Sequence, residues 1–203
     1  IRDVLKVDKV TYVAELKIDG LAMSLDYING RLNYAATRGD GVVGEDVTHN
    51  VITIKSIPTQ VKQLDSFEVR GEVYMPKKSL IALNKAKEEK GEALFANARN
   101  AAAGSIRNLD SKVAAMRKLD AFWYYFVNAS DYGLTSHYQA LMRLQEEGFR
   151  INPHIRLCQG IEEVLQYIDE YHQLRAQLDY DIDGIVIKVD DMKTREALGN
   201  TQK

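Results

Sequence analysis

The 203-residue sequence has one cysteine, three prolines and no long apolar segment. Cys158 has no partner for an internal disulfide, and a single cysteine cannot form a cysteine-rich zinc site. We interpret it as a small buried apolar residue in a reducing cytoplasm. No apolar run approaches the roughly 20 residues of a membrane span, and no basic-then-apolar secretory segment opens the sequence. We therefore expect a cytoplasmic protein with no membrane partner.

The charge balance argues against a uniformly basic protein, and the placement of the histidines argues against a histidine metal site. The formal net charge is −2, so any contact with nucleic acid requires a local basic patch instead of a uniformly basic surface. The four histidines are scattered without metal-ligand spacing, so we interpret them as structural or surface residues. A hydrophobic content of 45% and a charged content of 28% are ordinary for a globular protein of one large or two small domains.

Alternating apolar and polar residues predict strands, and Asn29-Gly30 predicts a two-residue hairpin turn between two of them. This turn pairs Ile28 with Arg31, and counting outward places Arg38 opposite Leu21. Because hairpin strands are antiparallel and helices are interspersed, we predict an α+β fold with antiparallel sheets and flanking helices. We expect strands at 11–17, 21–28, 31–37, 67–75, 121–128 (central) and 183–189 (buried), helices at 77–90, 97–108, 135–147 and 161–178, and a glycine-rich loop at 39–46.

Residues 15–20 read Glu-Leu-Lys-Ile-Asp-Gly and separate the first two expected strands. Alternation places Val13, Glu15 and Lys17 on one strand face. A free lysine amine, with a pKa of about 10.4, is mostly protonated at neutral pH, so a nucleophilic lysine needs burial or neighbouring cations to release its proton. Gly20 would let a phosphate come close. The four-residue pattern Lys-x-Asp-Gly is weak alone, since chance and turn chemistry explain most occurrences.

Three further segments carry candidate ligand-binding residues. Arg38 lies in a glycine loop at 37–41 and could grip phosphate, or it is a solvated arginine in a turn. Glu72 is a carboxylate in the middle of a strand and could accept hydrogen bonds from ribose hydroxyls, or it faces solvent. Lys188 lies inside an apolar strand and could contact a phosphate beside Lys17, or it extends from an edge strand to water.

The segment 95–118 is locally basic. Its five cations, Arg99, Arg107, Lys112, Arg117 and Lys118, stand against Asp110 alone, which gives a net charge of +5 − 1 = +4. Contact with a nucleic-acid backbone uses such a patch, and a charged, solvated helix face is the ordinary alternative.

In their order and spacing, these segments resemble the adenylation (nucleotidyltransferase) domain of bacterial NAD-dependent DNA ligases over nearly the whole chain. The loop at 37–41 continuing into 45–50, together with 97–110, indicates the NAD-using branch, whereas Lys-x-Asp-Gly alone fits ATP-dependent ligases, RNA ligases and capping enzymes equally well. The resemblance implies the nucleotidyltransferase fold of covalent ligases, with residues 1–203 as the adenylation core, truncated at both ends relative to the full-length ligase. It also implies a monomeric, cytoplasmic, nucleoid-associated bacterial protein.

The resemblance further implies a reaction in which Lys17 attacks the adenylyl phosphorus of NAD, releases nicotinamide mononucleotide (NMN) and forms a lysine-AMP intermediate. The AMP then passes to the 5′-phosphate of nicked double-stranded DNA for sealing. Magnesium is the expected metal, with manganese as a substitute, and zinc is expected only in the full-length protein. The implied roles are adenine contact for Glu15, ribose contact for Glu72, adenylate-phosphate contact for Arg38 and Lys188, support of the lysine for Asp19, metal ligation for Asp183, and DNA contact for Arg99, Arg107 and Arg175.

Two alternatives stay open at this point. One is an ATP-dependent nucleotidyltransferase of the DNA-ligase, RNA-ligase or capping type. The other is a catalytically silent fragment that binds adenine nucleotides or DNA.

Overall fold

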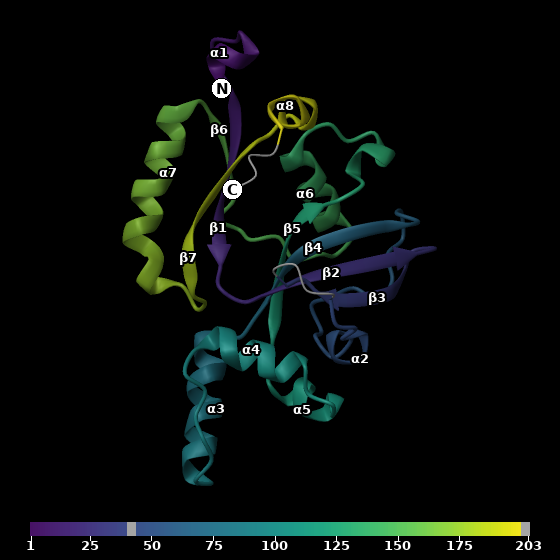
Figure 1. Cartoon of the computed structure of the whole chain (residues 1–203), viewed down its shortest axis with the longest axis vertical. Helices are drawn as coiled ribbons and strands as arrows, with labels where there is room; N and C mark the ends of the chain where they lie inside the picture. Colours follow the sequence, from purple (N-terminus) through teal and green to yellow (C-terminus); the bar gives the residue numbers. More distant parts are fainter. Residues whose placement is uncertain (40–43, 200–203) are drawn as a thin grey trace.

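A computed structural model describes residues 1–39 and 44–199. The strands in these ranges form a three-stranded sheet in the order β6-β1-β7 and a four-stranded sheet in the order β3-β2-β4-β5 (Figure 1). Every pairing within them is antiparallel, which confirms the predicted α+β fold. The strands are β1 (Thr11–Ile18), β2 (Leu21–Ile28), β3 (Arg31–Thr37), β4 (Phe67–Tyr74), β5 (Asp120–Phe126), β6 (Arg156–Gln159) and β7 (Ile182–Val189).

The four predicted helices are present as α3, α4, α6 and α7, close to their expected bounds. Several short elements were not predicted, because four to seven residues carry too little periodicity to reveal a buried face. None of the helices in the described ranges is long and apolar enough to cross a lipid bilayer. The helices are α1 (Arg2–Leu5), α2 (Thr48–Val51), α3 (Lys77–Glu89), α4 (Ala98–Ile106), α5 (Ser111–Met116), α6 (His137–Glu146), α7 (Ile161–Leu174) and α8 (Met192–Leu198), with 3-10 turns η1 (Ala129–Tyr132) and η2 (Arg175–Gln177).

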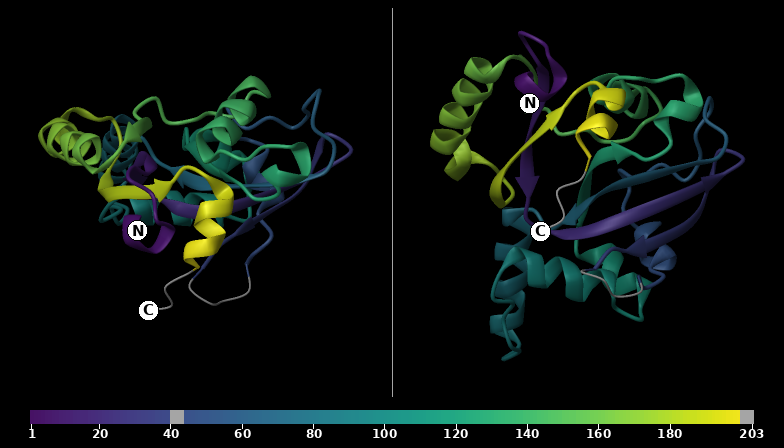
Figure 2. Two further views of the ribbon diagram at one scale, coloured as in Figure 1. Left: turned by 90° about the horizontal axis from the view of Figure 1, so that it is seen from above. Right: turned by 45° about the horizontal axis from the view of Figure 1, so that its top comes forward.

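One face of the three-stranded sheet is covered by α7, which lies on the side away from the four-stranded sheet (Figure 2). Alternate residues of β1, among them Tyr12 and Leu16, pack with Val164 and Tyr167 of α7 in one apolar cluster. The residues between them therefore face the other way, toward the four-stranded sheet. This confirms the predicted alternation that puts Glu15 and Lys17 on a common face.

The four-stranded sheet carries the larger core. The alternate residues of β2 from Leu21 to Tyr27 are buried and join an apolar cluster with residues of α4 and α6. Two predictions of strand position were wrong: β5, expected to be central, is an edge strand, and β7, expected to be buried, is an edge strand with only its two end residues buried. Aromatic and apolar content reveals a packed face, but not how many neighbouring strands flank it.

The hairpin between β2 and β3 is formed as predicted and pairs Ile28 with Arg31. A register shift next to Asp26 then displaces the outer part of the ladder by one residue. As a result, the backbone N–H of Arg38 donates to Ala22 (2.8 Å), and the predicted pairing of Arg38 with Leu21 was wrong. Residues 40–43 of the predicted glycine-rich loop lie outside the described residues.

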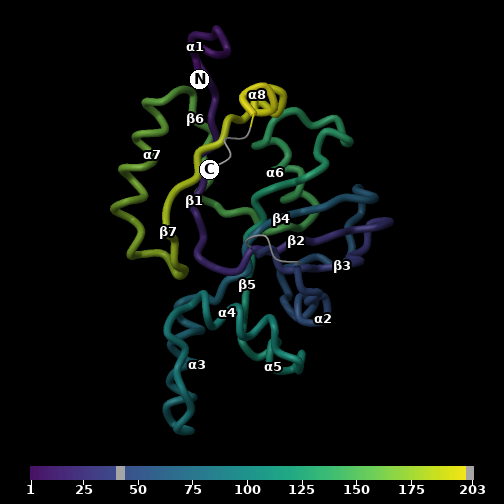
Figure 3. Tube along the Cα trace, in the orientation of Figure 1, coloured from purple at the N-terminus to yellow at the C-terminus, as the bar shows by residue number. Residues whose placement is uncertain are grey.

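The chain passes from one sheet to the other directly after β1, so the Lys-x-Asp-Gly segment joins the two sheets (Figure 3). Gly20 is required there because a Cβ atom at this position would lie 2.3 Å from the carbonyl oxygen of Val73 on β4. The close approach that this glycine permits is to the protein backbone, a reason that the sequence did not reveal.

Candidate functional site

A cavity of about 200 Å³ lies between the two sheets. Both sheets contribute to its wall, because β1 and β7 face β4 and β5 across it. The structure therefore brings together four of the predicted site residues. They are Glu15, Lys17, Glu72 and Lys188, and Tyr124, which was not predicted, lines the same cavity.

Lys17 lies at the rim of this cavity, and its side chain is 58% exposed. Its Nζ atom contacts Oδ2 of Asp183 at 3.4 Å. Of the two features expected of a nucleophilic lysine, burial or neighbouring cations, burial is not found, because this side chain is largely open to solvent and its contact partner is a carboxylate. A β-bulge explains the contact: Lys17 pairs with Gly184 and Ile18 with Ile182, which leaves Asp183 as the unpaired residue between them. Such a bulge re-aims a side chain next to a functional site.

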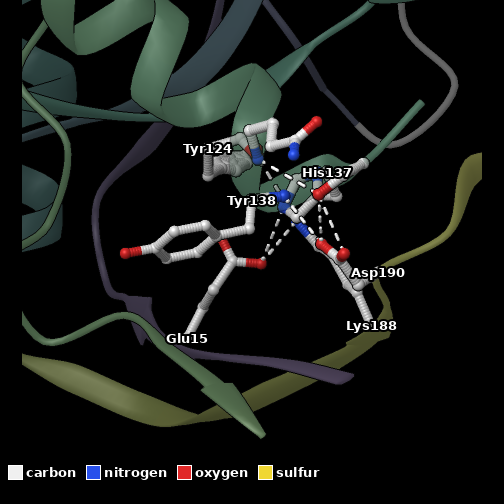
Figure 4. Close-up of polar contacts among 8 residues, drawn as sticks. Glu15, Tyr124, His137, Tyr138, Lys188 and Asp190 are labelled. Atoms are coloured by element: carbon white, nitrogen blue, oxygen red, sulfur yellow. Dashed lines mark hydrogen bonds and ion pairs between the residues drawn. The ribbon is translucent and has the colours of Figure 1, made fainter. Parts of the chain in front are cut away.

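Glu15 is the buried carboxylate of the cavity, with 4% of its surface exposed. Its Oε2 atom accepts from Nζ of Lys188 at 2.9 Å and lies 3.3 Å from Nε2 of His137 (Figure 4). Burial acts to raise the pKa of Glu15, but the hydrogen bond to His137 and the charge of Lys188 outweigh it, so the pKa is lowered overall. Glu15 is therefore ionised at neutral pH.

Lys188 lines the cavity and is held there by two residues, Glu15 and Tyr124. Besides Glu15, its Nζ atom donates to the carbonyl oxygen of Tyr124 at 3.3 Å and lies 5.2 Å from the centre of that ring. It pairs with Val13 on β1, four residues before Lys17, a separation of roughly 13 Å along a strand. Lys188 thus compensates the buried carboxylate of Glu15 directly, and strand geometry sets its backbone well apart from that of Lys17.

Glu72 faces the cavity from β4, and the pKa of its carboxyl group is raised. Burial raises the pKa of Glu72 to about 7, although the backbone N–H of Gly20 and the charge of Arg99 oppose the rise. The charges of Asp183 and Asp19 add to it. Near neutral pH this carboxyl group is therefore present in both protonated and ionised forms, so it can donate or accept a hydrogen bond.

Arg38 and Arg99 do not line the cavity, but both bring positive charge close to residues that do. Burial and then the charge of Glu72 raise the pKa of Tyr124, while the charge of Arg38 opposes the rise and thereby places Arg38 within electrostatic reach of the ring. Arg99, at the start of α4, lies 3.8 Å from Asp19. Its side chain is 61% exposed, so it borders the site instead of filling it.

The predicted metal ligand, Asp183, is accessible from the cavity rim, with a side-chain exposure of 43%. Across residues 1–39 and 44–199, no three His, Cys, Asp or Glu side chains form a group that could hold a metal ion. Within these ranges, protein side chains alone do not supply three clustered ligands for a metal ion. A single carboxylate nevertheless fits the way Mg²⁺ is bound when substrate phosphates supply further oxygens.

The other predicted DNA-contact residues lie away from the cavity. Arg107, at the end of α4, pairs with Glu45 at 3.2 Å, so the basic segment is less positive than its sequence sum. Arg175 begins η2 on the α7 side of β7, where it lines a separate cavity with Gly184 and His172. The structure thus spreads these arginines over two surfaces.

Two buried residues near these features were not predicted as functional. His137, interpreted from sequence as structural or surface, is fully buried and contacts Glu15 from the start of α6. Asn50 is also fully buried and donates from Nδ2 to the carbonyl oxygens of Ile106 (2.7 Å) and Asn108 (2.6 Å), which fixes the junction of α4 and α5. A lone histidine and a lone asparagine carry no sequence pattern that predicts such contacts.

Two antiparallel sheets around a charged cavity, with a lysine at the point where the chain crosses between them, are the organisation of an adenylation domain. Comparison with known protein families agrees, because residues 1–203 match the family described as the NAD-dependent DNA ligase adenylation domain. The chain belongs to this family.

The chain is also similar to bacterial proteins named DNA ligase. The chain is 54% identical over 194 residues to a DNA ligase of Bacillus cytotoxicus. These residues make up 96% of the chain and 29% of that protein. It is also 54% identical over 198 residues to a DNA ligase of Anoxybacillus flavithermus, and these residues make up 98% of the chain and 30% of that protein. The chain thus spans slightly under a third of the length of these curated relatives.

Proposed function

We propose that this chain is the adenylation core of an NAD-dependent DNA ligase and that Lys17 carries the AMP group. In this reaction the bond between Nζ and the adenylyl phosphorus forms as the bond from that phosphorus to the NMN phosphate oxygen breaks. NMN leaves with the electron pair, and the lysine nitrogen loses its proton. Asp183, 3.4 Å from Nζ, is the nearest charged acceptor for this proton.

The observation that carries the proposal is the shared cavity. Lys17 lines the same space as a buried, ionised carboxylate (Glu15), a carboxyl group with a pKa of about 7 (Glu72) and a half-buried ammonium (Lys188). A nucleotide presents a base amine, ribose hydroxyls and phosphates in that order, and these groups match the three side chains in chemistry. Holding the phosphorus near Nζ supplies most of the rate enhancement in such transfers.

We assign each group the contact that its geometry allows. Glu15 accepts from the adenine amine, and Glu72 binds the ribose hydroxyls. Lys188 has three donors, of which two are taken by Glu15 and by the Tyr124 carbonyl oxygen, so one remains for a phosphate. Arg38 adds a second positive charge on the phosphate side, and Asp19 orients the segment through Arg99.

A divalent metal, magnesium or manganese, would be held by Asp183 together with phosphate oxygens of NAD, and it would withdraw charge from the phosphate during transfer.

DNA is the proposed acceptor of the AMP group, and α4 and α5 are the proposed contact surface. Asn50 holds the loop between these helices rigidly, and this loop presents Leu109 with 96% of its surface exposed, between Arg107 and Lys112. An apolar side chain flanked by cations is how several proteins enter the minor groove. We propose that the ligase acts at nicks in the bacterial cytoplasm, because the curated relatives are bacterial DNA ligases.

The test is the intact mass of the purified chain after incubation with NAD, and separately with ATP. We expect a gain of one adenylyl group with NAD only, abolished in Lys17→Ala and retained in Lys85→Ala, a matched change on the exposed face of α3. An adduct that persists in Lys17→Ala would assign the nucleophile elsewhere. Adenosine binding without any adduct would support the silent binding fragment, and an adduct with ATP would support the ATP-dependent alternative.

A further inference from the structure

Glu15 and His137 form a buried polar pair beside the cavity. His137 is 0% exposed, and its Nδ1 atom has no hydrogen-bond partner among the described residues. Its one polar side-chain contact there is from Nε2 to Oε2 of Glu15, at 3.3 Å. A buried histidine with a single polar partner has its ring orientation fixed by that partner.

The protonation of this pair follows from its surroundings. Burial lowers the pKa of His137 and outweighs the opposing hydrogen bond to Glu15, while the nearby charges of Lys188 and Arg195 lower it further. The imidazole is therefore neutral at neutral pH. Since Glu15 is ionised and accepts only, the single N–H of the ring must be on Nε2.

The start of α6, of which His137 is the first residue, is fixed by hydrogen bonds to Asp190, the residue directly after β7. The backbone N–H of His137 donates to the carbonyl oxygen of Asp190 at 2.8 Å. The Asp190 carboxylate in turn accepts from the hydroxyl of Ser136 and the backbone N–H of Tyr138, both at 2.8 Å (Figure 4). Because Asp190 lies two residues after Lys188, the same strand end positions both donors that reach Glu15.

His137 and Lys188 both donate to the same oxygen of the Glu15 carboxylate, Oε2. Glu15 also lines the cavity, so its other oxygen, Oε1, is the one available to a ligand. We propose that His137 is a positioning residue for base recognition: with Lys188 it fixes Oε2 of Glu15, so that Oε1 presents a hydrogen-bond acceptor to the exocyclic amine of adenine.

This inference rests on the proposed function for the identity of the base, and it adds a residue that sets specificity without touching the ligand. Inosine monophosphate (IMP) is the matched probe, because it differs from AMP at the base by a carbonyl oxygen in place of the amine. A fixed carboxylate oxygen accepts from the amine and repels the carbonyl. We therefore expect wild-type protein to bind AMP at least about tenfold more tightly than IMP, or about 1.4 kcal/mol.

Two variants of His137 separate positioning from simple packing. In His137→Gln the amide nitrogen lies near the position of Nε2 and can still donate to Glu15, whereas in His137→Asn the shorter side chain places its amide near Nδ1. Both keep a buried polar group. Calorimetric titration of each folded variant with AMP and with IMP gives the ratio of dissociation constants, and circular dichroism confirms folding.

The proposal expects His137→Gln to keep most of the AMP preference and His137→Asn to bring the ratio close to one through weaker AMP binding alone. A wild-type ratio in His137→Asn would overturn it, and so would an equal loss of AMP and IMP affinity in both variants. If His137→Asn does not fold, loss of the preference in His137→Gln is the contrary result. A preserved AMP preference in protein that forms no Lys17 adduct would reject the proposed reaction while leaving this inference intact.

Discussion

The raised pKa of Glu72 gives a prediction that depends on the cavity alone. Its carboxyl group has a pKa of about 7 in the folded protein against an ordinary value of 4.5. Below about pH 4.5 both folded and unfolded states hold the proton, and the full stability is present. Between these values the folded state keeps a proton that the unfolded state has lost, so the free energy of unfolding falls as pH rises.

The magnitude follows from that interval. The difference between 4.5 and about 7 corresponds to a loss of roughly 3 kcal/mol once the pH exceeds 7, at 1.36 kcal/mol per pH unit. This figure is an upper bound because water in the cavity screens the charge. In Glu72→Gln the side chain keeps its shape and cannot ionise, so this part of the pH dependence disappears.

Urea unfolding of the chain and of Glu72→Gln at pH 5 and pH 8 measures the effect. We expect the variant to gain about 1 to 3 kcal/mol relative to wild type between the two pH values. Glu88→Gln, on the exposed surface of α3, controls for removal of a carboxylate from the chain. Parallel pH dependence in wild type and Glu72→Gln would refute the burial of this group in the cavity.

Four further substitutions test the packing and the proposed DNA surface. Gly20→Ala places Cβ against the carbonyl oxygen of Val73, so it should destabilise the fold by about 1 to 3 kcal/mol in urea unfolding, and an unchanged midpoint would contradict the close approach. Asn50→Ala leaves two carbonyl oxygens without their donor and should cost about 1 to 3 kcal/mol, measured by thermal unfolding; a variant as stable as wild type would contradict it. Arg107→Ala should lower the slope of log affinity for nicked DNA against log salt by about one, whereas Leu109→Ala should weaken binding at every salt concentration with the slope unchanged. Identical slopes for wild type and Arg107→Ala would remove that residue from the proposed interface.

Much of the fold could be predicted because its signals are local. The Asn29-Gly30 turn fixed the hairpin, and two-residue alternation in β1 placed Glu15 and Lys17 on one face. The position of Arg38 was wrong by one residue, since a register shift within the ladder leaves no mark in the alternation of neighbouring side chains.

The site itself was predicted as a set of residues, but not as a set of contacts. The bulge that turns Asp183 toward Lys17 arises from pairing between strands far apart in sequence. The contact of His137 with Glu15 depends on the hydrogen bond that ties the start of α6 to Asp190, directly after β7, which no pattern within α6 encodes. Burial, one of the two features expected to activate Lys17, is not found, because the strand ends there and the side chain reaches the cavity rim.

The most direct test of the central claim is peptide mapping of the chain after incubation with NAD. The account predicts that AMP is attached to the peptide containing Lys17, through the side-chain nitrogen of that residue, and that NMN appears in equal amount. An adenylylated peptide from any other part of the chain would contradict it, because the proposed transfer depends on Lys17 at the rim of the cavity.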